Sequence, residues 1–304
     1  MCIRDSLQTF RLPEPVKGEL ELRFRPTGKE KADTAATDSA VPEMIMPKSY
    51  LAEYVQYLGN AVPKDTLNVL CVGNSFTYYW GCPAMLKEIA WNEGHYLRVK
   101  STLKGGQTFG DHLALPVSRN VVNAGRYDYA FFQDQSQSPA RYASDTTQFD
   151  YVNTNFLKLT DRLLSRSRNC HVLLESTWSF EKDDFGGFGS HAAFDSLMTI
   201  GTSMMVRNAS KIFGANDFEV SPIGRAFSIV RNENPGIDLY SADSKHQSDY
   251  GSYLKACVNY LMIFRKPFQS QPADGATSSI DCGIPHDQAA YLRQVAERVV
   301  LGAR

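Results

Sequence analysis

LNVLCVGNSFTYY, residues 67–79, decides the fold of this chain. Its first half, residues 67–72, is apolar and rich in branched side chains, which is typical of a central strand in a parallel sheet. A Gly-Asn-Ser turn follows at residues 73–75, and residues 76–88 then have the apolar spacing of a helix with a proline near its start. Ser75 is therefore expected at the carboxyl end of a strand, the edge where open α/β sheets bind ligands.

Strands and helices alternate over the rest of the chain. Short apolar runs bounded by turn residues predict four further strands, at residues 96–102, 128–132, 170–174 and 218–222. Helical apolar spacing continues from residue 76 to about residue 93 and recurs at residues 149–166, 194–213, 253–264 and 285–300. This alternation predicts an α/β fold with a parallel sheet covered by helices on both faces.

Residues 1–47 differ in composition from the rest. Residues 19–25 alternate apolar and polar side chains like one edge strand, and residues 26–47 are charged and poor in large apolar residues, as in a linker. Because one strand cannot form a core, we interpret residues 1–47 as the remnant of an upstream module or as an incomplete amino terminus. Residues 48–304, which begin with a helical pattern at 49–59, form the second predicted domain.

The composition and net charge of the chain limit the kinds of molecule that it is expected to bind. With 43% hydrophobic and 12% aromatic residues, the 304-residue chain can bury a large core. The net charge is −1, from 32 Lys and Arg against 33 Asp and Glu, so no electrostatic footprint indicates nucleic acid or an anionic membrane as a partner. No apolar run reaches the roughly 20 residues of a membrane span, and residues 1–9 lack the residue order of a signal peptide.

The six cysteines lie far apart, without the Cys-x-x-Cys or Cys/His spacing of a zinc site. We therefore expect no bound metal. Cys71 in a predicted strand and Cys257 in a predicted helix are expected to be small buried hydrophobic residues.

Two short blocks resemble a known superfamily. Gly-Asn-Ser-Phe-Thr at residues 73–77 resembles the Gly-Asp-Ser-Leu nucleophile block of the SGNH (GDSL-type) hydrolases, with Asn and Phe in place of Asp and Leu. Asp-Ser-Lys-His at residues 243–246 resembles the Asp-x-x-His block of the same superfamily, in the same chain order. The resemblance implies that Ser75 is a nucleophile, His246 its base and Asp243 the residue that orients His246. The alternative for this spacing alone is a surface loop with a solvated Asp and His.

The two middle blocks of the superfamily have weaker counterparts. Lys-Gly-Gly-Gln-Thr at residues 104–108 is either a bare turn or, by resemblance, the block whose Gly106 supplies an N–H to the oxyanion hole together with that of Ser75. Phe-Phe-Gln-Asp-Gln-Ser resembles a variant third block in which Gln replaces the usual Asn donor, and Gln133 is the favoured match. Gln135 and Gln137 remain alternatives, as does a solvated Gln-rich loop.

Two further residues are candidates for substrate binding. Trp178 follows the strand predicted at residues 170–174 and is either a stacking wall for a sugar ring or an ordinary aromatic at the rim. Asn74, beside Ser75, is the second candidate.

The resemblance covers about residues 66–265. Within the superfamily, the combination of the four blocks is similar to that of a poorly characterised bacterial branch, whose members are often predicted to be secreted hydrolases. It implies a three-layer α/β/α sandwich of flavodoxin-like type, no metal or organic cofactor, and hydrolysis of a small acyl ester, such as acetyl on a carbohydrate, through an acyl-serine. It also implies an extracytoplasmic location. A non-catalytic carbohydrate-binding relative and an acyltransferase remain alternatives, and the sugar, the acyl group and the oligomeric state stay open.

Overall fold

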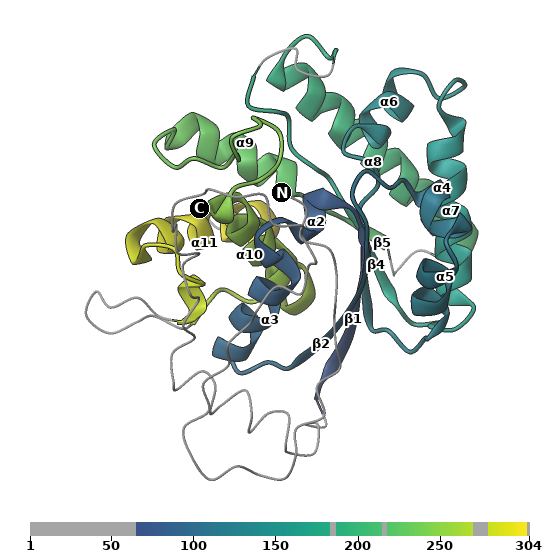
Figure 1. The fold of residues 1–304 in the computed structure, drawn as a ribbon, viewed down its shortest axis with the longest axis horizontal. Coiled ribbons are helices and arrows are strands. Elements are labelled where there is room, and N and C mark those ends of the chain that lie inside the picture. Colours follow the sequence, from purple (N-terminus) through teal and green to yellow (C-terminus); the bar gives the residue numbers. More distant parts are fainter. Residues whose placement is uncertain (1–64, 183–186, 215–217, 270–278, 303–304) are drawn as a thin grey trace, which may run out of the picture. The chain divides into compact units, whose positions relative to one another are not determined.

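The computed structural model describes residues 65–182, 187–214, 218–269 and 279–302 (Figure 1). The chain divides into two units between residues 62 and 63, and all described residues belong to the second unit. The edge strand expected at 19–25 and the features expected up to residue 59 lie outside the described residues. The division of the chain at residue 47 therefore stays a prediction.

Five parallel strands form the sheet of the described residues. They are β1 (Leu67–Gly73), β2 (Leu97–Leu103), β3 (Tyr129–Phe132), β4 (His171–Glu175) and β5 (Phe218–Ser221). Their spatial order is β2-β1-β3-β4-β5, the flavodoxin-like order, in which the direction of winding reverses between β1 and β3. The five predicted strands are confirmed, each to within one residue at either end.

Strand β1 is buried on both of its faces. Val69 and Cys71 pack into one apolar cluster, whereas Leu70 and Val72 point to the opposite face and pack into a second. All four side chains are at most 3% exposed. A continuous apolar run, rather than an alternating one, is what a strand covered on both sides requires.

Helices cover both faces of the sheet (Figure 1). One layer contains α3 (Cys82–Asn92), α9 (Ile223–Glu233), α10 (Asp249–Phe264) and α11 (His286–Leu301). The other contains α4 (Phe109–Ala114), α5 (Pro116–Asn123), α7 (Asp150–Leu164) and α8 (His191–Phe213), and α6 (Ser138–Ser144) packs on α8. The predicted three-layer α/β/α sandwich is thereby confirmed.

The long helix expected after Ser75 is interrupted. The chain forms α2 (Ser75–Tyr78), a short 3-10 helix η1 (Tyr79–Gly81) and then α3. Trp80 has φ 53° and Gly81 has φ 67°, left-handed values that no right-handed helix can include. The break turns the chain between the Ser75 segment and α3, whose first turn contains the proline.

Buried cysteines fill small spaces in the core. Cys71, Cys82, Cys170 and Cys257 are buried, and Cys282, near the 3-10 helix η2 (Ser279–Asp281), is partly buried. The predicted burial of Cys71 and Cys257 is confirmed.

Within the described ranges, no helix combines the length and the apolar character needed to cross a bilayer.

Candidate active site

The turn between β1 and α2 presents Ser75 at the start of a helix. Asn74 has an extended backbone, and its side-chain oxygen accepts the N–H of Phe76 at 3.1 Å, which caps α2. A Cβ on Gly73 would meet Thr77 Oγ1 at 2.7 Å and Gln133 Oε1 at 2.8 Å, so only glycine fits there. Asn74, a candidate for substrate binding, is 2% exposed and serves the turn itself.

Ser75, His246 and Asp243 form a chain of two hydrogen bonds, with His246 in the middle. Ser75 Oγ is 2.7 Å from His246 Nε2, although the two residues are 171 positions apart. His246 Nδ1 is 2.5 Å from Asp243 Oδ2. Since a carboxylate only accepts, Nδ1 carries a proton and Nε2 is left to accept the proton of the Ser75 hydroxyl.

The Asp243 carboxylate is held in its ionised form. Burial favours the neutral acid, but hydrogen bonds from the His246 ring and from the backbone N–H groups of His246 and Lys245 outweigh it and lower the pKa of Asp243. The two backbone bonds measure 2.9 and 3.1 Å. Ser244 adopts φ 58°, which closes the loop tightly enough for one carboxylate to reach both the ring and the backbone.

Two aromatic rings pack around the imidazole of His246. Tyr79 stacks on it, with ring centroids 4.2 Å apart and planes 11° from parallel. Phe76 lies at a centroid distance of 5.2 Å on a tilted plane. The ring is therefore fixed by contacts from the segment that follows Ser75 as well as by Asp243.

Trp178 is not at the rim of the site, so its prediction as a stacking wall is wrong. The indole is 0% exposed and stacks between Phe76, at 4.8 Å, and Phe227, at 4.3 Å. Its Nε1–H donates to the Lys245 carbonyl oxygen at 3.1 Å. Trp178 thus supports the loop that contains His246, and its ring faces are occupied by protein.

The loop of Gly106 lies against the turn at residues 73–75. The Lys104 N–H donates to the Gly73 carbonyl at 3.2 Å, and Asn74 Nδ2 donates to the Gln107 carbonyl at 2.9 Å. Gly106 has φ 71°, a value that favours glycine. Neither its N–H nor that of Ser75 has an acceptor among the described residues.

Gln133 forms hydrogen bonds to the turn at residues 73–75 and to the start of α2. Its Oε1 accepts the Asn74 N–H at 3.0 Å and the Thr77 hydroxyl at 2.9 Å, and its Nε2 donates to the Asp134 carbonyl. Gln133 is 0% exposed and Gln137 is 8% exposed, whereas Gln135 is only partly buried. Of the three candidate glutamines, Gln133 is thus the one most fully committed to internal contacts.

A buried ion pair that sequence reasoning missed lies under α2. Lys255 Nζ is 2.6 Å from Glu175 Oε2, and both side chains are at most 1% exposed. The ammonium group also donates to the Phe76 carbonyl at 2.8 Å and to Thr77 Oγ1 at 3.1 Å. Asn259 donates to the other Glu175 oxygen at 2.8 Å. A lysine inside the apolar run of α10 was the sequence signal for this network.

Asp134 connects the loop at residues 104–108 to the loop at residues 133–138. Its Oδ1 accepts the N–H of Phe109, at the start of α4, and the N–H of Gln135, at 2.9 and 2.8 Å. Burial raises the pKa of Asp134 to about 7, against the opposing effect of these two hydrogen bonds. The carboxyl group therefore fixes the 133–138 loop to the helix that follows Gly106.

His112 was also missed and lies behind the turn. Its Nε2 is 2.9 Å from the Gly73 carbonyl and its Nδ1 is 2.9 Å from Ser118 Oγ. Burial lowers the pKa of His112, so the ring is neutral near pH 7. Because a carbonyl only accepts, Nε2 carries the proton and Nδ1 accepts from Ser118.

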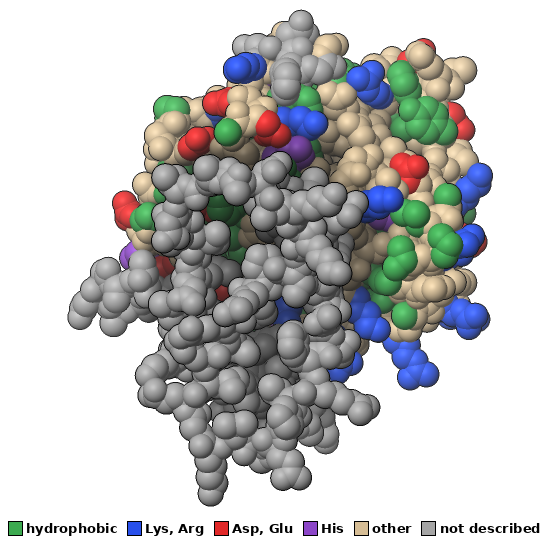
Figure 2. Space-filling model, in the orientation of Figure 1, with side chains coloured by type: hydrophobic (Ala, Val, Ile, Leu, Met, Phe, Trp, Pro, Cys, Tyr) green, Lys and Arg blue, Asp and Glu red, His purple; other side chains and the backbone are tan. Residues whose placement is uncertain are grey.

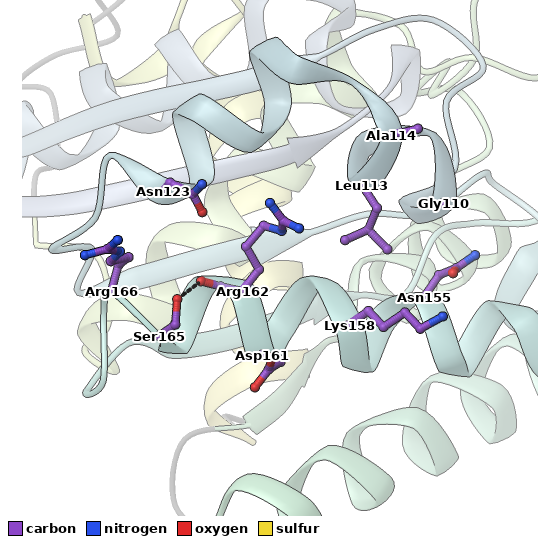
Figure 3. A pocket seen from close by; sticks show the side chains of 10 residues that line it. All are labelled: Gly110, Leu113, Ala114, Asn123, Asn155, Lys158, Asp161, Arg162, Ser165 and Arg166. Carbon is purple, nitrogen blue, oxygen red and sulfur yellow. Dashed lines mark hydrogen bonds between the residues drawn. The ribbon is translucent and has the colours of Figure 1, made fainter.

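A pocket of about 740 Å³ lies elsewhere, between α4, α5 and α7 (Figure 3). Arg162 extends from α7 toward the two shorter helices, and Lys158 and Arg166 lie on either side of it along α7 and its end. Figure 2 shows Lys and Arg side chains gathering over the α5 side of the described surface. Ser75, Asp243 and His246 do not line this pocket.

The chain matches no family model and no curated protein. Among solved structures, a DUF4886 family protein from Bacteroides uniformis has a TM-score of 0.56 at 16% identity, over 78% of this chain and 95% of that one. The acetylxylan esterase Axe2 from Geobacillus stearothermophilus has a TM-score of 0.50 at 13% identity, over 67% of this chain and 97% of that one. At sequence identities of 16% and 13%, these two similarities show a shared fold.

The fold and the geometry of the candidate site together define the structural class of this protein. The chain is a flavodoxin-like α/β/α protein, of the fold expected for SGNH hydrolases, with a serine, a histidine and an aspartate hydrogen-bonded in line beside the carboxyl edge of its sheet.

Proposed function

We propose that this protein is a serine ester hydrolase that acts through an acyl-serine intermediate. The observation that carries the proposal is the contact of 2.7 Å between Ser75 Oγ and His246 Nε2, with Nδ1 of the same ring on Asp243. A solvated histidine in a surface loop would not be expected to form a hydrogen bond with a serine 171 positions away in the sequence. This alignment is the one that a histidine base needs to activate a hydroxyl nucleophile.

The reaction divides into two half-reactions. Ser75 Oγ attacks the ester carbonyl carbon while its proton passes to His246 Nε2, and the tetrahedral intermediate collapses as the imidazolium protonates the departing alcohol. Water then attacks the acyl-serine, gives a proton to Nε2, and the carboxylic acid leaves as Ser75 recovers its proton. Asp243 keeps the tautomer and stabilises the imidazolium in both halves.

The oxyanion is stabilised by the N–H groups of Ser75 and Gly106 and by one glutamine amide. The two N–H groups are suited to this role because nothing in the described chain accepts from them. Gln135 is the better third donor, because Gln133 is 0% exposed and its amide is bonded within the turn. Gln135 is only partly buried, and its Nε2 makes one longer hydrogen bond, of 3.3 Å to Ser136 Oγ. Each such donor contributes about 3 kcal/mol to transition-state stabilisation in other serine hydrolases.

The substrate we infer is a small acyl ester, with acetyl on a carbohydrate as the leading case. The support is the resemblance of the motifs and the likeness in fold to an acetylxylan esterase. Because the fold accommodates many ester substrates, the experiment below includes a sugar ester beside a simple one.

The test compares wild type with Ser75→Ala on 4-nitrophenyl acetate and on acetylated xylooligosaccharides, by release of 4-nitrophenol and of acetate. Wild type should turn over ester and Ser75→Ala should not, with an unchanged circular dichroism spectrum. Absence of any Ser75-dependent turnover would favour the non-catalytic relative instead. Transfer of acetyl to added sugar alcohols in preference to water would identify an acyltransferase.

A further inference from the structure

Two exposed aromatic side chains lie within five residues of Ser75. Tyr78 is 40% exposed and Trp80 is 57% exposed. The other large hydrophobic side chains of the described residues with high exposure lie on the outer helices α5, α7 and α8. An exposed indole contributes little burial to stability, so its presence beside the nucleophile calls for another explanation.

The backbone at Trp80 is strained. Trp80 adopts φ 53° and ψ 21°, a conformation that a bulky side chain rarely takes and that glycine or asparagine would take at lower cost. The segment is held from both sides, because the Tyr79 carbonyl accepts the Ser252 hydroxyl at 2.9 Å and also the N–H of Cys82. Strain of this kind persists at functional sites when the surrounding structure enforces it.

The two aromatic residues lie against the two loops that flank Ser75. Trp80 Nε1 donates to Ser241 Oγ at 3.4 Å, and the Ser241 N–H donates to the His246 carbonyl at 2.8 Å. On the other side, the Tyr78 hydroxyl lies near Gly105, where a Cβ would meet it at 3.0 Å. One ring therefore borders the histidine loop and the other borders the loop of Gly106.

We propose that Trp80, together with Tyr78, is the platform on which a sugar ring of the substrate stacks while its ester lies at Ser75. This inference rests on the proposed esterase function and specifies its substrate class. A pyranose ring has an apolar face of C–H groups and a polar rim of hydroxyls. An indole or phenol ring at a wet surface offers the matching apolar face, with polar groups at its edge. Trp178, with both faces covered, offers none.

The test uses Trp80→Ala and Tyr78→Ala, with Tyr151→Ala as the matched control, since Tyr151 is 52% exposed on the distant helix α7. The substrates are acetylated xylooligosaccharides, acetylated glucose and 4-nitrophenyl acetate. Trp80→Ala raises KM for the sugar esters about tenfold and leaves kcat within about twofold, the loss expected for one aromatic stacking contact. All kinetics of the Tyr151→Ala control stay unchanged, and Trp80→Ala raises KM less for 4-nitrophenyl acetate, which has no sugar ring, than for the sugar esters. Trp80→Phe recovers part of the KM.

Three outcomes would overturn the platform. One is a KM for sugar esters that Trp80→Ala does not change. Another is an equal loss of kcat on all substrates, which would make Trp80 a support for His246 instead. The third is Ser75-dependent hydrolysis of 4-nitrophenyl acetate with no hydrolysis of either sugar ester, which leaves the esterase proposal standing.

If no ester is hydrolysed, the esterase proposal fails, and calorimetric titration of the wild type with xylooligosaccharides decides on the platform. Binding that Trp80→Ala abolishes and Tyr151→Ala preserves supports it, and the absence of binding overturns it.

Discussion

Lys255 Nζ, in α10, donates a hydrogen bond of 2.8 Å to the backbone carbonyl of Phe76, the residue directly after Ser75. The same ammonium group pairs with Glu175 at the end of β4, so one buried cation joins the Ser75 turn, a strand end and a core helix. Because both charges are out of water, the pair can hold the turn only while both members are present.

Removing one member of this pair should therefore destabilise the protein strongly. Lys255→Met leaves the Glu175 carboxylate buried without its cation, and we expect the free energy of unfolding to fall by about 3–5 kcal/mol in urea denaturation. The double variant Glu175→Gln/Lys255→Met should recover much of the loss, since no buried charge remains. Arg298→Gln, which removes an exposed partner of Glu233, is the control and should change little. An equal loss in Lys255→Met and the control would contradict this role.

The glutamines of the third block should separate into two roles. Gln135→Ala should lower kcat on 4-nitrophenyl acetate by ~10²-fold or more, as loss of an oxyanion donor does, with a smaller change in stability than Gln133→Ala because its one accepted hydrogen bond, from the Gln137 N–H, is only partly buried. Gln133→Ala leaves the Asn74 N–H and the Thr77 hydroxyl without their buried acceptor, so it should lower the free energy of unfolding by about 1–3 kcal/mol. Full activity in Gln135→Ala would remove that residue from the oxyanion hole.

Asp243→Asn tests the orientation of the base. An amide can donate to His246 Nδ1 and so favours the tautomer whose Nε2 carries the proton, which cannot take the proton of Ser75. We expect kcat and kcat/KM to fall together by as much as ~10⁴-fold, with substrate affinity changed much less. Steady-state kinetics with circular dichroism as the folding control measure this. A variant that keeps a tenth of the activity would indicate another orienting group.

The raised pKa of Asp134 predicts a pH dependence of stability. Burial shifts this pKa from the ordinary carboxyl range to about 7, so between pH ~4 and 7 the folded protein binds a proton that the unfolded chain does not. The stabilising contribution of this protonation is complete below about pH 4 and is lost as the pH rises through 7. Asp134→Asn removes the titrating group and keeps an oxygen acceptor.

The difference in urea midpoint between Asp134→Asn and wild type should therefore move in favour of the variant as the pH rises from 4 to 8. A difference that is independent of pH over this range would show that Asp134 does not titrate there.

The sequence alone could predict those features of the fold that depend on the local pattern of apolar and polar residues. The apolar run of β1 predicts a buried central strand, and the alternation of strands with helices predicts the layers. The order of the Ser75 and Asp243–His246 blocks led to residues that the fold brings into contact, which spacing along the chain could not demonstrate.

What depends on distant partners could not be predicted. Trp178 follows a strand end, and its sequence context does not reveal that Phe227 and Phe76 enclose it. Glu175 and Lys255 are 80 positions apart, so neither residue identifies the other as its partner. The break at Trp80 overrides the helical spacing because Gly81 takes a left-handed conformation before the proline in the first turn of α3.

The central claim is that Ser75 forms a covalent acyl-enzyme with His246 as its base. The most direct measurement is intact-protein and peptide mass spectrometry after treatment with diethyl 4-nitrophenyl phosphate, which traps activated serines. The account predicts one added diethylphosphoryl group, on the peptide that contains Ser75, in wild type. It predicts none in Ser75→Ala and strongly slowed labelling in His246→Ala. Labelling at another residue, or hydrolysis of 4-nitrophenyl acetate by Ser75→Ala at the wild-type rate, would contradict it.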